Sequence, residues 1–235
     1  MFIDSHCHLD FDVFSEDLSN LINQCENQNI TQFIIPSIGK QNWHSVISLC
    51  ARENNFTPAL GIHPCFISDH ELDTDIDNLE LTIIENKVKI LGEIGLDKRY
   101  KETFDTQKLF FSKQIQLAKQ LEIPVLIHSV KAHTEIIAAI KSSKFDSGGI
   151  IHAFNGSLEI AQIYINLGFK LGIGGLITYT QNKKLLQVVS HLPLTSFVLE
   201  TDSPDMPIFN QDRSQPNTPL NLVHIFSAFC ECRNE

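Results

Sequence analysis

The sequence lacks the features that usually divide a chain into parts. It has no proline-, glycine- or serine-rich linker, no low-complexity tract, no block of like charges and no repeat of solenoid type. With 43% hydrophobic residues among 235, it can bury a large core. We therefore expect residues 1–235 to form one domain.

Two further absences concern location and binding. The first residues show no basic segment followed by a long apolar run, and no apolar stretch is long enough to cross a bilayer. We expect a cytoplasmic protein without membrane attachment or an obligate protein partner, and its six scattered cysteines favour reduced thiols. A formal charge of −10 excludes the broad basic surface of an architectural nucleic-acid-binding protein. It does not exclude an enzyme that contacts a few phosphates.

Several catalytic motifs are also missing. GLDKRY and LGIGG contain glycines but complete neither the P-loop nor the dinucleotide fingerprint. No G-x-S-x-G elbow of a serine hydrolase is present. The sequence therefore gives little support to nucleoside triphosphate, NAD or serine-hydrolase chemistry.

What the sequence does contain is a series of short apolar runs that alternate with longer segments of helical period. The runs predict strands at residues 2–6, 30–38, 56–63, 88–96, 124–129, 148–154, 169–175 and 196–201. Nearly continuous apolar runs are typical of parallel strands covered on both faces. About eight strand–helix units predict an α/β fold of the (β/α)₈ (TIM) barrel type, with a doubly wound open sheet as the alternative.

Two helices are predicted in detail. Thr218 and Pro219 match the N-cap and first position of a last helix. The segment 103–122 has helical period, and its predicted buried face carries Phe104, Leu109, Ile115, Ala118 and Leu121.

Polar residues gather where the predicted strands end. They are His6 and His8 on the first strand, His63 on the third, Glu93 on the fourth, His128 on the fifth, His152 on the sixth and Asp202 after the eighth. In a barrel these ends meet on one face, where barrel enzymes carry their sites. Five other histidines fall in predicted helices or loops, where we expect solvated or locally bonded rings: His44, His70, His133, His191 and His224. His133 lies near enough to the fifth strand to approach the rim.

Four imidazoles and two carboxylates exceed the ligand set of one structural zinc but fit two divalent ions that share a carboxylate. We expect Glu93 to bridge the ions, His6, His8 and Asp202 to hold one, and the histidines of strands five and six to hold the other. Two ions roughly 3.5–4 Å apart generate a bridging hydroxide for phosphodiester or ester hydrolysis. Asp202 can transfer the proton. The donor set suits Mg²⁺, Mn²⁺ or Zn²⁺.

The first of these segments, IDSHCHLD, holds more polar groups than can bind one metal. Side chains alternate along a strand, so Cys7 is expected to face the helices as a packing residue, opposite to the two histidines. Asp4 shares their face but lies deeper, where it could orient an imidazole. Asp10 is expected in a loop at the rim.

Six blocks in order, DSHCHLD, GIHP, GEIGLD, PVLIHS, IIHAFNGS and LETDSPDMP, resemble the TatD family of metal-dependent hydrolases within the amidohydrolase superfamily. The resemblance implies a (β/α)₈ barrel with two divalent metals that acts as a 3′-to-5′ exonuclease on DNA, with RNA as a further substrate. It implies catalytic roles for Glu93 and Asp202 and contact of His63 with substrate phosphate. The implied metal ligands are His6, His8, Glu93, His128, His152 and Asp202.

The chain departs from the family pattern at three places. Cys65 stands where many relatives have histidine, and Val130 stands where relatives have arginine. We expect Lys131 to contact substrate instead, as a point charge without a bidentate fork. The chain stops at CECRNE, where relatives continue with another helix, so we expect a C-terminal helix that is either naturally short or truncated. The alternative function is hydrolysis of an ester or amide, for example by a D-aminoacyl-tRNA deacylase, which would use the same ligands.

Overall fold

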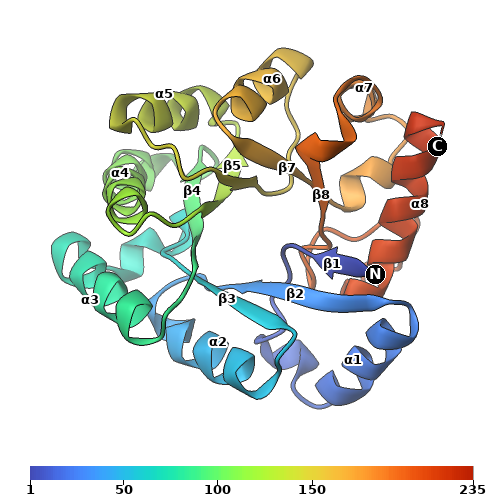
Figure 1. The fold of residues 1–235 in the computed structure, drawn as a ribbon, viewed down its shortest axis with the longest axis horizontal. Coiled ribbons are helices and arrows are strands. Elements are labelled where there is room, and N and C mark those ends of the chain that lie inside the picture. Colours follow the sequence, from blue (N-terminus) through green and yellow to red (C-terminus); the bar gives the residue numbers. More distant parts are fainter. Residues whose placement is uncertain (235) are drawn as a thin grey trace.

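The computed structural model describes residues 1–234, and its centre is an eight-stranded parallel sheet whose strands pair in chain order (Figure 1). The strands are β1 (Phe2–Asp4), β2 (Ile30–Pro36), β3 (Phe56–Leu60), β4 (Ile90–Asp97), β5 (Val125–Val130), β6 (Gly149–Ile151), β7 (Phe169–Ile173) and β8 (Phe197–Leu199). Each strand pairs in parallel with the next from β1 to β8. This order is the one that the alternating apolar runs predict.

The first and last strands meet through the segments that follow them. Asp202 donates its backbone N–H to the His6 carbonyl oxygen (2.8 Å), and His8 donates to that of Ser203 (2.7 Å). A parallel bridge also joins Cys7 and Ser203. These bonds close the sheet, so the predicted (β/α)₈ barrel is confirmed and the open doubly wound alternative is wrong.

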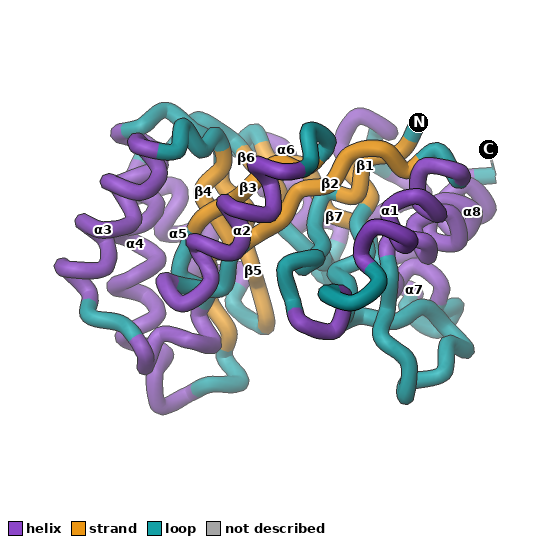
Figure 2. Tube along the Cα trace, turned by 90° about the horizontal axis from the view of Figure 1, so that it is seen from below, coloured by secondary structure: helices purple, strands orange, loops and turns teal. Residues whose placement is uncertain are grey.

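Helices follow the strands and surround them, and the start of β1 lies against the last helix, where Phe2 meets Phe226 edge to face (Figures 1 and 2). In the described residues they are α1 (Leu18–Asn27), α2 (Lys40–Arg52), α3 (Leu72–Glu85), α4 (Phe104–Gln120), α5 (His133–Ser143), α6 (Leu158–Asn166), α7 (Lys183–His191) and α8 (Leu222–Arg233). Within residues 1–234, no helix has the length and apolar character that a membrane span requires.

Several strands end earlier than predicted. β1 stops at Asp4 rather than at residue 6, and β8 stops at Leu199 rather than at residue 201. His6, His8 and Asp202 therefore lie beyond the regular strands, on the segments that follow β1 and β8.

Two helix predictions need correction. Leu109 is 57% exposed, because α4 turns Phe110 and Phe111 toward the core instead. Thr218 precedes a 3₁₀ turn at Pro219–Asn221, makes no side-chain cap bond, and is separated by that turn from α8. The end of the predicted domain, residue 235, lies outside the described residues.

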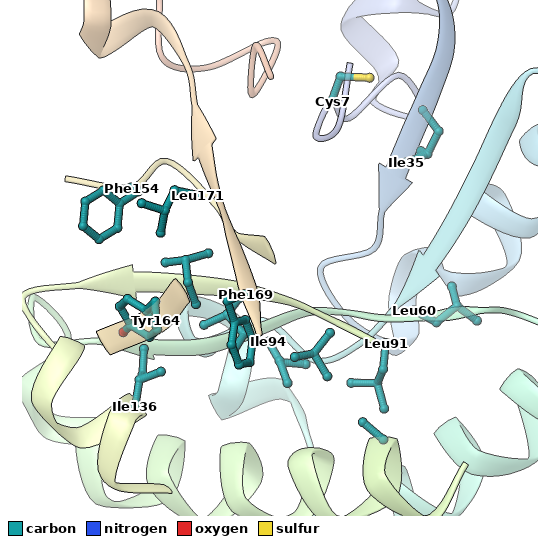
Figure 3. Close-up of a cluster of buried hydrophobic side chains, with 14 of the residues drawn as sticks. Cys7, Ile35, Leu60, Leu91, Ile94, Ile136, Phe154, Tyr164, Phe169 and Leu171 are labelled. Carbon is teal, nitrogen blue, oxygen red and sulfur yellow. The ribbon is translucent and has the colours of Figure 1, made fainter. Parts of the chain in front are cut away.

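The main core fills the space between the strands and the helices, and Figure 3 shows part of it, with Tyr164 and Phe169 close together. Cys7 is fully buried in this core, which confirms its packing role. Two buried glutamines on α4 tie the helix to the carboxyl ends of strands: Gln114 bonds both backbone groups of Ile62, and Gln107 bonds both backbone groups of Asp97. These clamps fix the segments from which site residues project.

Candidate metal centre

The structure brings the six predicted metal ligands together at the carboxyl end of the barrel. They form three groups in which the donor atoms lie within 4.8 Å of one another: His6, His8 and Glu93; Glu93, His128 and His152; and His6, His152 and Asp202. Glu93 belongs to the first two groups, and the third group shares His6 with the first and His152 with the second. The first two groups therefore offer adjoining positions for a cation with one shared carboxylate, and Asp202 lies beside both.

The two oxygens of Glu93 face different imidazoles. Oε2 lies 3.2 Å from His6 Nε2 and 3.9 Å from His8 Nε2, whereas Oε1 lies 3.1 Å from His128 Nδ1 and 3.4 Å from His63 Nε2. The Glu93 side chain is only 3% exposed. It is placed between the groups, as a bridging carboxylate must be.

Both carboxylates of the centre favour the ionised form. Burial opposes ionisation of Glu93, but His6, His63 and a hydrogen bond from His128 outweigh it and hold its pKa well below the usual value. Burial also opposes ionisation of Asp202, yet the charge of His152 and its hydrogen bond lower that pKa to about 2. The centre therefore holds two ionised carboxylates among imidazoles.

Two histidines are oriented by groups on their outer side. His8 donates a hydrogen bond from Nδ1 to the Pro36 carbonyl oxygen (3.2 Å). Its unprotonated Nε2 then faces the centre and can bind a cation. His128 Nε2 lies 3.1 Å from Asp97 Oδ2, so its Nδ1 faces Glu93. Asp97 is in turn paired with Arg99 at 2.5 Å. A carboxylate behind an imidazole is the usual device that fixes a metal ligand.

His152 has a carboxylate behind it as well. Its Nδ1 lies 2.9 Å from Glu200 Oε1, and that oxygen also accepts the backbone N–H of Ala153 (2.6 Å). Its Nε2 points to Asp202 Oδ2 at 3.5 Å. Gly172 leaves the space that Glu200 occupies, because a Cβ at this position would collide with the carboxylate.

His63 lies at the centre with a different hydrogen-bond pattern. Its Nδ1 accepts the backbone N–H of Cys65 (3.2 Å), so in the neutral ring Nε2 carries the proton. This nitrogen then donates toward Glu93, although His63 also groups with Cys65 and His128, with one possible ligand atom from each within 4.8 Å of the others. Cys65 Sγ lies 3.6 Å from Asp97, and burial raises its pKa to about 12. A protonated thiol at the mouth is therefore expected.

Two other residues from the sequence analysis do not join the cluster. Lys131 is exposed on the loop after β5, and the described residues offer it no hydrogen bond or ion pair. His133 Nδ1 instead bonds Ser129 and Tyr164 on the outer side of the barrel, at 2.9 and 3.2 Å.

The buried Asp4 does not orient an imidazole. Its carboxylate accepts the Thr201 N–H (3.0 Å), the Thr201 hydroxyl (2.6 Å) and the backbone N–H of His6 (3.3 Å). Burial raises its pKa to about 7. Asp4 therefore ties together the two backbone segments that carry His6 and Asp202. Asp10 lies in a loop as predicted and accepts a bond from Asn42 (2.9 Å).

Sequence reasoning missed three supporting residues: Asp97, Arg99 and Glu200. Asp97 and Glu200 stand inside the quoted blocks GEIGLD and LETDSPDMP, next to predicted ligands. A signal was available for them, because a metal-bound histidine usually has an acceptor on its other nitrogen. Only the folded barrel shows that Asp97 lies behind His128 and Glu200 behind His152.

The residues fit divalent cations. Ionised carboxylates and imidazole nitrogens converge, and His8, His128 and His152 each have an acceptor oxygen within 3.2 Å of the outer nitrogen, which directs the inner nitrogen toward the centre. A bound cation would balance the repulsion between the two carboxylates.

Comparison with known proteins gives consistent results. The family model described as "TatD related DNase" matches residues 3–235. An uncharacterized metal-dependent hydrolase of Escherichia coli, YjjV, is 35% identical over 237 residues, covering 100% of this chain and 91% of the relative. The human protein "Deoxyribonuclease TATDN3" is 31% identical over 237 residues, covering 95% of this chain and 85% of the relative.

Solved structures agree with these relatives. The crystal structure of YjjV superposes with a TM-score of 0.93 over 100% of this chain and 91% of that one. An E. coli phosphotriesterase homology protein, at 14% identity and a TM-score of 0.68 over 98% of this chain and 91% of that one, shares the fold alone. The chain belongs to the TatD family of metal-dependent hydrolases.

Proposed function

We propose that this hydrolase cleaves phosphodiesters and removes nucleotides from the 3′ ends of DNA. The observation that carries the proposal is the pair of ligand groups that share Glu93, because two adjoining cations suit in-line displacement at a phosphoryl group. The family description and the deoxyribonuclease name of the human relative support DNA as the substrate.

Each residue of the centre has a role in this proposal. His6, His8 and Asp202 would hold one divalent ion, His128 and His152 the other, and Glu93 both. Mg²⁺, Mn²⁺ and Zn²⁺ are the candidates. When bound, the two ions supply an attacking hydroxide at neutral pH and neutralise charge on the phosphoryl oxygens.

The remaining steps belong to side chains at the opening. Asp202 is 15% exposed, against 3% for Glu93, so its carboxylate is the one that solvent and substrate reach. In this proposal it accepts the proton of the attacking water and returns it to the leaving oxygen. His63 Nε2–H would donate to a phosphate oxygen, and Lys131 would add a positive charge at the rim.

The test uses single-stranded DNA labelled at its 5′ end, with each metal added separately. We expect products that shorten one nucleotide at a time, and no shortening when the 3′ terminal linkage is a phosphorothioate. Glu93→Ala and Asp202→Asn should each fall below about one hundredth of wild-type activity, since losses of 10–100-fold follow even from changes behind the ligands. Asp105→Asn, whose side chain is 94% exposed on α4, is the matched control.

Parallel reactions separate the substrate classes. Shortening of labelled RNA would extend the activity to RNA. Release of the amino acid from D-aminoacyl-tRNA, with DNA and RNA intact, would replace the nuclease with the ester hydrolase. Undiminished turnover by the Glu93 or Asp202 variant would overturn the two-metal assignment.

A further inference from the structure

A cavity of about 370 Å³ lies beside the metal centre, between the loops that follow β7 and β8. Its walls include Leu176, Tyr179, Asp205, Met206, Arg213 and Gln215. A second cavity of only about 10 Å³ shares Leu176 and Met206 with it and is lined by Asp202 and Glu200. The larger cavity is thus next to the opening of the centre, and the smaller one has room for little more than a water molecule.

The walls of the larger cavity are held by hydrogen bonds. Tyr179 donates its hydroxyl proton to the Pro207 carbonyl oxygen (3.2 Å), and its ring meets Phe209 edge to face at 5.4 Å. The buried amide of Asn217 donates to the carbonyl oxygens of Thr201 (2.8 Å) and Asp205 (2.7 Å). The same amide therefore joins the cavity wall to the segment that carries Asp202.

The lining combines an aromatic ring, a cation, a carboxylate and an amide. Tyr179 is half-buried and rigid, and Arg213 is exposed, with no hydrogen bond or ion pair to the described residues. Asp205 and Gln215 provide acceptors, and Gln215 also a donor. This set complements a flat heteroaromatic ring that carries both N–H or O–H donors and an anionic group.

We infer that this cavity binds the nucleoside next to the phosphodiester that is cleaved, with its base against Tyr179 and a phosphate near Arg213. The inference rests on the proposed function and adds the place where a substrate nucleotide is recognised. The volume lies within the range of small-molecule sites. Stacking on an aromatic ring is tolerant of base identity, and the planar guanidinium of arginine suits phosphate.

The first experiment measures binding without turnover. Thymidine 5′-monophosphate and inorganic phosphate are titrated calorimetrically into the metal-loaded protein. We expect the nucleotide to bind more tightly than phosphate. Tyr179→Ala should weaken the nucleotide alone, by about tenfold for the lost stack, and Arg213→Ala should weaken the nucleotide by about tenfold for the lost charge. Tyr179→Phe should keep the ring and the affinity, and Arg52→Ala, which removes an exposed guanidinium from α2, is the control.

The second experiment compares the methyl and the thymidine 5′ esters of p-nitrophenyl phosphate. Wild-type protein should prefer the thymidine ester in kcat/KM, and Tyr179→Ala should lose about tenfold on that ester alone. Equal use of both esters by wild type, or equal binding of nucleotide and phosphate, would overturn the subsite. Failure to cleave either ester, with nucleotide binding still dependent on Tyr179, would overturn the nuclease function but leave the subsite standing.

Discussion

At the scale of residues, the centre depends on pairs in which one side chain orients another. His128 can face Glu93 with Nδ1 only while Asp97 occupies the opposite nitrogen. Arg99 in turn pairs with Asp97, and their contact, with the hydrogen bond from His128, holds the pKa of Asp97 well below its usual value despite burial. Replacement of Asp97 should therefore impair the centre by changing the orientation and protonation of His128.

Asp97→Asn is the direct test. An amide can donate to His128 Nε2, which would favour the tautomer that keeps its proton on Nδ1, the nitrogen that faces Glu93 and would have to lose that proton to bind a cation. We expect metal affinity and activity to fall roughly 10–100-fold. Calorimetric metal titration measures the first, and Asp105→Asn, on an exposed position of α4, is the control. Unchanged metal affinity would show that Asp97 does not orient a ligand.

At the scale of elements, the site is held by polar contacts between helices and strand ends. Gln114 lies on the buried face of α4 and accepts the N–H of Ile62 (2.8 Å) while it donates to its carbonyl oxygen (3.1 Å). Ile62 is 1% exposed and precedes His63. The clamp thus connects the packing of a helix to the position of a site residue.

Gln114→Leu should leave both backbone groups of Ile62 buried and unbonded. We expect a loss of about 2–4 kcal/mol in the free energy of unfolding, measured in urea. Gln120→Leu removes an exposed glutamine from the same helix and should change stability by less than about 0.5 kcal/mol. Equal effects of the two substitutions would refute the clamp.

A second contact between elements joins α2 and α3. The fully buried Asp75 carboxylate accepts bonds from Lys40 (2.7 Å) and His70 (2.9 Å). Burial opposes its ionisation, but these bonds outweigh burial and lower the pKa of Asp75. A depressed carboxyl pKa contributes stability above the unfolded value of about 3.9 and loses it as the pH falls through the folded value.

Asp75→Asn should therefore cost about 2 kcal/mol at pH 7, since both hydrogen bonds lose a charged acceptor. The difference from wild type should shrink below about pH 4, where the unfolded carboxyl is protonated. Urea unfolding at pH 7 and pH 3 measures it. Asp73→Asn, whose side chain is 84% exposed on the same helix, is the control, and a gap that persists unchanged in acid would contradict the prediction.

At the scale of the whole molecule, the net charge of −10 sets how nucleic acid can bind. The proposed contacts involve two cations at the opening, Lys131 and Arg213, rather than a basic surface. For single strands, each neutralised phosphate contributes about −0.7 to the slope of log affinity against log salt. The slope should therefore be small.

We expect a slope of about −1.4 for binding of a short single-stranded DNA by the Asp202→Asn protein, from two phosphate contacts. In that background, Arg213→Ala should reduce its magnitude by about 0.7, and Arg52→Ala should leave it unchanged. Fluorescence anisotropy over a range of salt concentrations measures the slope. A slope several times steeper would show that DNA lies on other basic groups of the molecule.

Much of this architecture was readable in advance from local patterns. The alternation of apolar runs with helical segments predicted the barrel, and parity along residues 3–10 separated Cys7 from the two histidines. Leu109 was misplaced because a one-residue error in helical phase moves a side chain by about 100°. The end of the first strand was predicted too late because residues 5–9 stay buried beyond Asp4, where the regular strand ends.

The sequence by itself determined the class of fold and which polar side chains end up at one face, because the period of side chains and the direction of parallel strands are local properties. Only the tertiary structure decided which group lies at each nitrogen of each imidazole. Asp97 behind His128, Glu200 behind His152 and the backbone N–H of Cys65 at His63 are groups on the outer side of each ring. The partner of one nitrogen determines whether the other is a ligand or a donor, and most of these partners come from other segments of the closed barrel.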